Sequence, residues 1–219
     1  MVAVYTEKVN FFFQLSPGFL AHLEDICYIG KNGKEHIAMD VLVVVDMQND
    51  FVSGALGTKE AFDIVPYVVG RVVEGVNRGE TILFTRDTHG PDYPETQEGR
   101  KLPVPHCIRG SQGWEIIPQL QEYAAHPIDK PTFGSTVLGE LLKARDEDLR
   151  RQGKPGVEKV TLIGVCTDIC VLSNALLIKA FLPETEIVVE AACCAGVTPQ
   201  SHETALSAMA ACQITVLRP

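Results

Sequence analysis

The sequence of 219 residues lacks most of the features that would identify a membrane or secreted protein. No apolar run approaches the roughly 20 residues that a membrane-spanning helix needs. No stretch near the start combines a signal-peptide core with a small-residue cleavage site. Its seven cysteines include no CxxC pair and no zinc-finger spacing, and a disulfide framework would be unusual for a chain of this length. We therefore expect a cytoplasmic protein with reduced thiols.

Positive charge is also scarce. The 19 lysines and arginines are outnumbered by 28 acidic residues, which gives a formal net charge of −9. This balance argues against nucleic acid or an anionic membrane as the natural partner. Neither a G-x-G-x-x-G motif nor a Walker A loop is present, so nucleotide-binding folds are disfavoured. With 46% hydrophobic and 21% charged residues, the chain can bury a full core.

Residues 1–38 differ in pattern from the rest of the chain. They contain a possible short helix from Pro17 to Ile26 and a polar, turn-rich linker from Gly30 to Lys34. They could form an arm that packs on the domain or on a neighbouring subunit, or a segment peripheral to a compact domain. We treat residues 1–38 as an N-terminal extension of unknown role and residues 39–219 as the folded domain.

From residue 40 onward, short apolar runs alternate with segments of helical periodicity. Such alternation predicts an α/β fold with three layers, in which helices cover both faces of a mostly parallel sheet. The predicted strands are 41–45, 81–85, 124–128, 159–165, 186–189 and 213–217. The predicted helices are 64–76, 114–123, 137–152, 170–181 and 200–211.

Polar residues follow several of these strands, and ligands of such sheets bind at the carboxyl ends of the strands. Cys170 comes soon after the fourth strand, where the start of a helix would lower a thiol pKa and favour a nucleophilic thiolate. A buried, inert thiol is the alternative. Asp46 follows the first strand as a candidate general base or a simple cap. Lys130 follows the third strand and would stabilise both groups, unless it is a solvated surface charge.

A second group of residues suits a metal ion. Asp87 and His89 follow the second strand, and His106 lies in a proline-flanked loop. A carboxylate and two imidazoles can hold zinc, iron or manganese with positions left for substrate. The alternative is a salt-bridged acid beside two ordinary histidines. Cys193 and Cys194 are better explained by packing than by chemistry.

From about residue 40 to the end, the chain resembles the isochorismatase-like cysteine hydrolases, and within them the nicotinamidases and pyrazinamidases. Five motifs occur in the order of that family. They are Val45-Asp46-Met47-Gln48-Asn49-Asp50-Phe51, Thr85-Arg86-Asp87-Thr88-His89, Pro105-His106-Cys107-Ile108-Arg109-Gly110-Ser111-Gln112-Gly113, Asp129-Lys130-Pro131-Thr132-Phe133-Gly134-Ser135, and Gly164-Val165-Cys166-Thr167-Asp168-Ile169-Cys170-Val171.

The resemblance implies a six-stranded sheet in the order 3-2-1-4-5-6 and a catalytic triad of Asp46, Lys130 and Cys170. It also implies a cis peptide between Val165 and Cys166, with the backbone N–H groups of Cys166 and Cys170 forming an oxyanion hole. In such enzymes the cysteine attacks an amide carbonyl, ammonia leaves, and water hydrolyses the thioester. The implied reaction is the conversion of nicotinamide to nicotinate, a step of NAD salvage.

The resemblance assigns Asp87, His89 and His106 as ligands of a divalent metal, with zinc favoured over manganese or iron. Glu98 is the candidate fourth ligand, with Glu95 as the alternative. The metal of these enzymes takes the pyridine nitrogen of the substrate. An aromatic residue usually precedes the second metal histidine, whereas this chain has Leu102-Pro103-Val104 there. The aromatic face is then expected from one of three residues, namely Phe51, Tyr93 and Phe133.

Two other functions stay open on the sequence alone. The protein could hydrolyse another small amide, a ureide or an isochorismatase-type substrate. It could also be a catalytically silent domain that mediates assembly, although a complete triad argues against this. A homo-oligomer, either a dimer or a tetramer, is expected by analogy with the family, with a small-molecule amide as the other partner.

Overall fold

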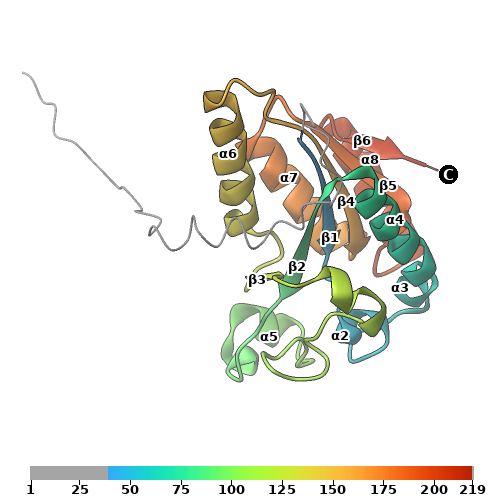
Figure 1. Ribbon diagram of the computed structural model, residues 1–219. Coiled ribbons are helices and arrows are strands. Elements are labelled where there is room, and N and C mark those ends of the chain that lie inside the picture. Colours follow the sequence, from blue (N-terminus) through green and yellow to red (C-terminus); the bar gives the residue numbers. More distant parts are fainter. Residues whose placement is uncertain (1–38, 219) are drawn as a thin grey trace, which may run out of the picture.

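The computed structural model describes residues 39–218, so the predicted extension and its helix lie outside the described residues (Figure 1). The chain alternates strands with helices. The strands are β1 (Met39–Val45), β2 (Thr81–Asp87), β3 (Ile128–Lys130), β4 (Val157–Val165), β5 (Glu186–Ala195) and β6 (Thr215–Leu217). The longer helices are α4 (Val65–Arg78), α6 (Thr136–Arg151), α7 (Leu172–Phe181) and α8 (Pro199–Ala211). The short ones are α2 (Asn49–Val52), α3 (Lys59–Asp63), α5 (Gln97–Lys101), the 3₁₀ turns η1 (Tyr93–Glu95) and η2 (Pro118–Tyr123), and the π turn η3 (Thr167–Val171).

The six strands form one sheet in the order β3-β2-β1-β4-β5-β6, and every neighbouring pair is parallel. The central strand β1 aligns Val43 with Leu83 of β2 on one side and with Leu162 of β4 on the other. The predicted α/β fold and strand order are confirmed. Parallel strands buried on both faces explain the continuous apolar runs in the sequence.

Helices cover both faces of the sheet, as Figure 1 shows for α6 and α7 on one side and for α3 and α4 on the other. Alternate residues of β1 face opposite layers. Val41 and Val43 belong to a core cluster that includes side chains of α6, α7 and α8. Leu42 and Val44 belong to a second cluster that includes Val68 of α4. None of the described helices is long and apolar enough to span a membrane.

Two predicted elements are wrong in position or type. The third strand, expected at 124–128, is Ile128–Lys130. The helix expected at 114–123 is reduced to the 3₁₀ turn Pro118–Tyr123. The preceding residues instead pair with the loop after β1, because the Ile117 amide donates to the Met47 carbonyl at 2.9 Å and Ile116 forms an antiparallel bridge with Gln48. Backbone pairing with a distant segment overrides the local helical pattern.

The backbones of β1 and β4 approach closely just before η3, the turn that contains Cys170. Gly164 has φ +114°, and an added Cβ would lie 2.2 Å from the Val45 carbonyl oxygen. Only glycine fits such a position. This approach brings the end of β4 beside the end of β1, where Asp46 begins the next loop.

Candidate active site

Four chemically reactive side chains lie together at the carboxyl ends of adjacent strands. Asp46 is the first residue after β1, Asp87 ends β2, and Lys130 ends β3. Cys170 lies in η3, the single π turn that follows β4. The exposed fraction of each is 5% or less. The parallel sheet therefore brings together residues that are far apart in the sequence.

Lys130 is the centre of this group. Its Nζ lies 2.7 Å from Asp46 Oδ2, 3.2 Å from Asp87 Oδ1 and 3.5 Å from Cys170 Sγ. Burial alone would lower the pKa of Lys130, but the Asp46 carboxylate and the other anionic groups beside it raise the pKa above its usual value. The ammonium group is thus charged and contacts a carboxylate and a thiol at the same time.

Asp46 is completely buried, and its two oxygens have different environments. Oδ1 accepts a hydrogen bond from Thr85 Oγ1 at 2.7 Å. Oδ2 forms the ion pair with Lys130 but has no well-aligned hydrogen bond among the described residues. Burial raises the pKa of Asp46, opposed in part by the Lys130 charge. A carboxylate with a raised pKa is suited to accept a proton.

The expected lowering of the Cys170 thiol pKa is wrong. Complete burial, followed by the Asp46 carboxylate, raises the pKa well above the ordinary value, and the Lys130 charge does not offset this. The residue begins no regular α-helix, because it lies within the π turn. The raised pKa favours the thiol over the thiolate, and the neighbouring Asp46 carboxylate is the candidate acceptor of its proton.

The backbone around Cys170 is fixed by its neighbours. The peptide bond between Val165 and Cys166 is cis, and the Cys166 carbonyl accepts hydrogen bonds from the amides of Ile169 and Val171 at 3.1 and 3.0 Å. Asn174 donates to the Cys170 carbonyl at 2.8 Å, and its Oδ1 accepts from the Ser135 amide at 2.9 Å.

Asn174 thus connects the turn that contains Cys170 to the loop after Lys130. This role was not predicted from the sequence. The signal was available in the sequence. Asn174 is a polar residue four positions after Cys170 in a mostly apolar helix.

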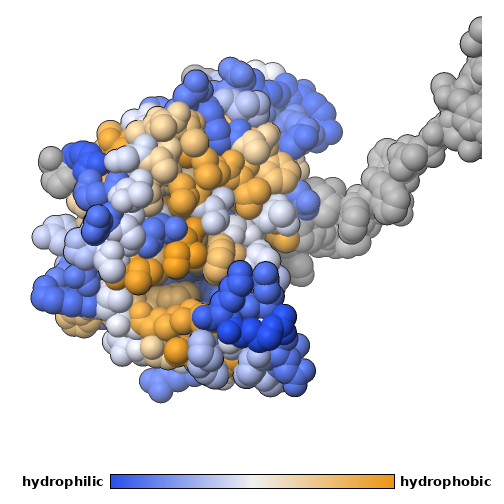
Figure 2. Space-filling view, turned by 180° about the vertical axis from the view of Figure 1, so that it is seen from behind, coloured by the Kyte–Doolittle hydropathy of each residue, from blue (hydrophilic) through white to orange (hydrophobic). Residues whose placement is uncertain are grey.

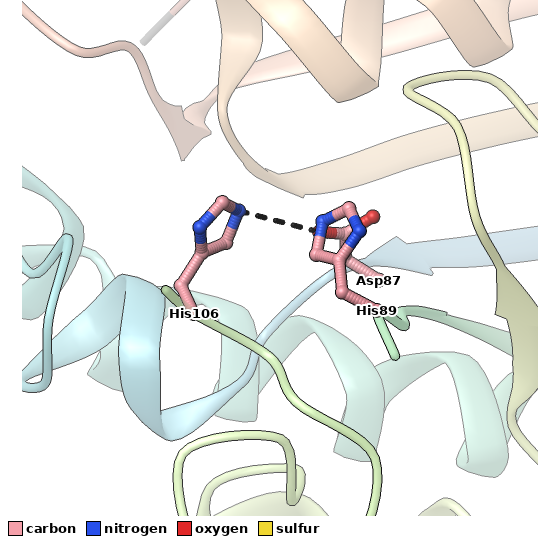
Figure 3. A group of neighbouring side chains, drawn as sticks. All are labelled: Asp87, His89 and His106. Atoms are coloured by element: carbon pink, nitrogen blue, oxygen red, sulfur yellow. Dashed lines mark ion pairs between the residues drawn. The ribbon is translucent and has the colours of Figure 1, made fainter. Parts of the chain in front are cut away.

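Asp87, His89 and His106 form a compact group in which each residue offers a ligand atom within 4.8 Å of the others (Figure 3). Asp87 Oδ2 lies 2.9 Å from His89 Nε2 and 3.6 Å from His106 Nε2. Burial alone would raise the pKa of Asp87, but His89 and Lys130 lower it, so the carboxylate is ionised.

Both imidazoles in this group have Nε2 close to the Asp87 carboxylate. His106 Nδ1 lies 2.8 Å from the Val104 carbonyl and so carries the proton, which leaves Nε2 free to bind a metal. His89 Nε2 is buried without a well-aligned hydrogen bond, although Asp87 is close. A buried imidazole nitrogen that lacks a well-aligned hydrogen bond, with a carboxylate and a second imidazole around it, is suited to bind a cation.

Glu98, on the short helix α5, lies at the edge of this group. Its Oε1 is 3.7 Å from His89 Nε2 and 3.9 Å from His106 Nε2. It therefore faces the same point as the two imidazoles, without belonging to the compact set of three. Glu95 is exposed on η1, and its backbone carbonyl accepts a hydrogen bond from Arg100.

Gln48 also supports this group and was not among the predicted site residues. It is fully buried, and its side chain hydrogen-bonds both the N–H and the carbonyl of Asp87 at 2.7 and 2.8 Å. Its Nε2 also donates to the Trp114 carbonyl. A glutamine two positions after Asp46 thus holds the end of β2 in place.

A cavity of about 560 Å³ opens over the group around Lys130 and over the candidate metal ligands. Cys170, Asp87 and His106 lie on its wall, together with two of the three predicted aromatic residues, Phe51 and Phe133. The third does not line it. Tyr93 is fully buried behind the imidazoles, with its ring centroid 4.7 Å from that of His89 and its hydroxyl donating to the Leu102 carbonyl.

The fold and this arrangement of residues define the class of the protein. Residues 40–218 match the family model described as the isochorismatase domain, and the chain belongs to the isochorismatase family of hydrolases. It is 28% identical to the nicotinamidase of Schizosaccharomyces pombe over 208 residues, which covers 80% of this chain and 91% of that protein.

Solved structures of two other proteins are similar. One is the pyrazinamidase of Pyrococcus horikoshii in complex with zinc, with a TM-score of 0.66, 28% identity, and coverage of 82% of this chain and 99% of that one. The other is the N-carbamoylsarcosine amidase of Thermoplasma acidophilum, with a TM-score of 0.62, 27% identity, and coverage of 82% and 96%. The relatives therefore include amidases with different named substrates.

Proposed function

We propose that the protein is a cysteine-dependent amidohydrolase that hydrolyses nicotinamide or a related heteroaromatic amide to the carboxylic acid and ammonia. The observation that carries the proposal is the position of Lys130 Nζ, 2.7 Å from Asp46 Oδ2 and 3.5 Å from Cys170 Sγ, where Cys170 lies on the wall of a cavity that Asp87 and His106 also line. This places a nucleophile, a proton acceptor and a cation within reach of one bound amide.

The first half of the reaction forms a thioester. Cys170 Sγ attacks the amide carbon while its proton passes to Asp46, whose pKa is raised by burial. Lys130 compensates the negative charge that the pair then holds. The backbone N–H groups of Cys166 and Cys170 are the proposed donors to the tetrahedral oxyanion. Asp46 returns the proton to the amide nitrogen, the carbon–nitrogen bond breaks, and ammonia leaves.

The second half regenerates the thiol. A water molecule attacks the thioester carbon and gives its proton to Asp46. The carbon–sulfur bond breaks, Cys170 takes the proton back from Asp46, and the carboxylic acid is released. Asp46 therefore acts as base and acid once in each half, which requires that its pKa be close enough to that of its partners for the proton to move both ways.

We assign Asp87, His89 and His106 as the residues that would hold a divalent metal, with Glu98 as the further candidate. Two nitrogens and a carboxylate favour zinc, and the zinc complex of the Pyrococcus relative supports that choice. When bound there, the metal would supply a Lewis acid for a pyridine or pyrazine nitrogen. Phe51 and Phe133 would then flank the ring. The cytoplasmic location and the homo-oligomeric state stay predictions.

The test is ammonia release from nicotinamide and pyrazinamide by the full-length protein, with and without a chelator. We expect Cys170→Ala to lower the rate at least about 10⁴-fold, because the proposed thioester forms on the Cys170 sulfur. The matched control is Cys193→Ala, which removes another buried thiol that does not line the cavity. A Cys170→Ala protein that releases ammonia at the rate of the unmodified protein would contradict the proposal.

A further inference from the structure

The cavity is larger than nicotinamide requires. Even if each of the roughly nine non-hydrogen atoms of nicotinamide is given the volume of about 30 Å³ that a water molecule takes in the liquid, the total is about 270 Å³. The cavity measures about 560 Å³. About half of the space is therefore left over when a single six-membered ring with its carboxamide is bound.

The remaining space is bounded mainly by apolar side chains. Six of them line the cavity: Phe51, Leu56, Leu102, Phe133, Ile169 and Val197. Three of these side chains are also unusually accessible for apolar groups, with exposed fractions of 38% for Leu102, 47% for Phe133 and 48% for Val197. Figure 2 shows a hollow in the surface with hydrophobic residues at its edge. Apolar walls of this kind favour an apolar group of the ligand.

In contrast, the part of the site that would hold the leaving group is closed to solvent. Asp46 must reach the departing nitrogen, but it is 0% exposed, Lys130 is 1% exposed, and neither lines the cavity. A substituent on the amide nitrogen would point toward these buried charges. The free volume therefore lies on the acyl side of the substrate, and the leaving group is ammonia.

On the basis of the proposed function, we propose that the preferred substrates are primary amides whose acyl group extends beyond a single six-membered ring through an apolar substituent. Burying an additional phenyl-sized group on the apolar wall would raise kcat/KM about tenfold or more over that of nicotinamide.

The experiment compares three amides with the full-length, zinc-loaded protein. They are nicotinamide, a quinoline carboxamide, and a nicotinamide with a phenyl group meta to both the ring nitrogen and the carboxamide. We expect at least one extended amide to exceed nicotinamide about tenfold in kcat/KM. Calorimetry with the Cys170→Ala protein should show a similar advantage in Kd, which tests the fit of the ligand independently of turnover.

Val197→Trp should fill part of the free volume and lower the ratio of kcat/KM between the extended amide and nicotinamide by about tenfold. The matched control is Val73→Trp on α4, which alters a valine of similar exposure that does not line the cavity and should leave the ratio unchanged.

Hydrolysis of nicotinamide in preference to both extended amides, together with weaker binding of both to Cys170→Ala, would overturn this inference and leave the proposed function intact. Failure to release ammonia from any of the three amides, by folded protein with metal bound, would contradict the proposed function instead. Calorimetry would then still decide whether the cavity accepts an apolar extension.

Discussion

Two regions of the molecule bury the same combination of groups, a cation between two carboxylates with a thiol nearby. One is the Lys130 cluster, formed by Lys130, Asp46, Asp87 and Cys170. The other, the Arg71 cluster, lies between α4 and β5. Arg71 pairs there with Glu80 at 2.9 Å and with Glu190 at 2.8 Å. Cys193 is its thiol, and burial followed by Glu190 raises its pKa to about 11.

The difference between the two clusters lies in their surroundings rather than in their composition. Cys170 lies on the wall of a 560 Å³ cavity beside the candidate metal ligands, whereas Cys193 does not line this cavity. Arg71 presents a guanidinium whose donors meet both carboxylates, a geometry that serves to hold two elements together. Lys130 presents a compact charge that contacts a proton acceptor and a thiol. A buried ion cluster thus becomes a site only where substrate can reach it.

The largest difference in activity between the two clusters should appear when the cation of each is removed. We expect Lys130→Met to lower kcat/KM at least about 10³-fold, because Asp46 and Cys170 lose the charge that stabilises the thioester-forming step. Arg71→Met should leave kcat/KM of the folded protein within about threefold. Ammonia release with nicotinamide measures both.

Lys130→Met and Arg71→Met should have similar effects on the free energy of unfolding. Each substitution leaves two buried or partly buried carboxylates without a cation, which costs on the order of 3–5 kcal/mol in the free energy of unfolding. The cost for Arg71→Met should be at the lower end, because Glu190 keeps 21% of its side chain exposed. Equal losses of activity in both variants, measured beside urea unfolding curves, would remove the distinction between the two clusters.

A smaller effect is expected from changes to the candidate metal ligands. One of these ligands, Asp87, also belongs to the Lys130 cluster. His89→Ala removes one of three compact donors and should weaken zinc binding at least about 100-fold. His126→Ala, which alters an exposed histidine away from the cavity, is the control and should retain the metal. Elemental analysis after dialysis gives the readout. Equal zinc content in both variants would exclude His89 as a ligand.

The smallest effect concerns the pH dependence of the reaction. Asp46 must be ionised to take the thiol proton, so activity should be lost as the pH falls through its pKa, which burial raises. The hydrogen bond from Thr85 lowers that pKa, and Thr85→Val should therefore move the acidic limb of kcat/KM to higher pH, with a change of less than about threefold near the optimum.

Thr161→Val makes the same substitution at a buried position of β4 and is the control. It should leave the acidic limb in place. A limb that stays in place in Thr85→Val would mean that Asp46 is not the group whose ionisation limits the reaction.

The sheet and most of the site residues could be predicted from the sequence for physical reasons. Strands buried on both faces leave continuous apolar runs such as 41–45, and their carboxyl ends bring Asp46, Asp87, Lys130 and Cys170 to one edge. The short edge strand β3 was misplaced because it contains Asp129 and Lys130. The burial of Lys130 depends on carboxylates that are distant in the sequence, and no local pattern records that pairing.

The electrostatic details were harder to predict. The thiol pKa of Cys170 depends on how deeply the turn is buried and on the nearby Asp46 carboxylate, and both oppose the helix-terminus effect that the local sequence indicates. Tyr93 is one of the aromatic residues expected from the sequence to face the substrate. Its ring nevertheless packs behind His89 instead of lining the cavity, and only the folded loop decides the side on which it lies.

The most direct test of the central claim is to look for the acyl group on Cys170. The protein is mixed with excess nicotinamide, quenched in acid within the first turnovers, digested and analysed by mass spectrometry. We predict a mass increase equal to a nicotinoyl group, which fragmentation of the peptide places on Cys170 rather than on Cys166, and none on the peptide that contains Cys193. Ammonia release at the full rate while Cys170 remains unmodified, or an acyl group on a different residue, would contradict the account.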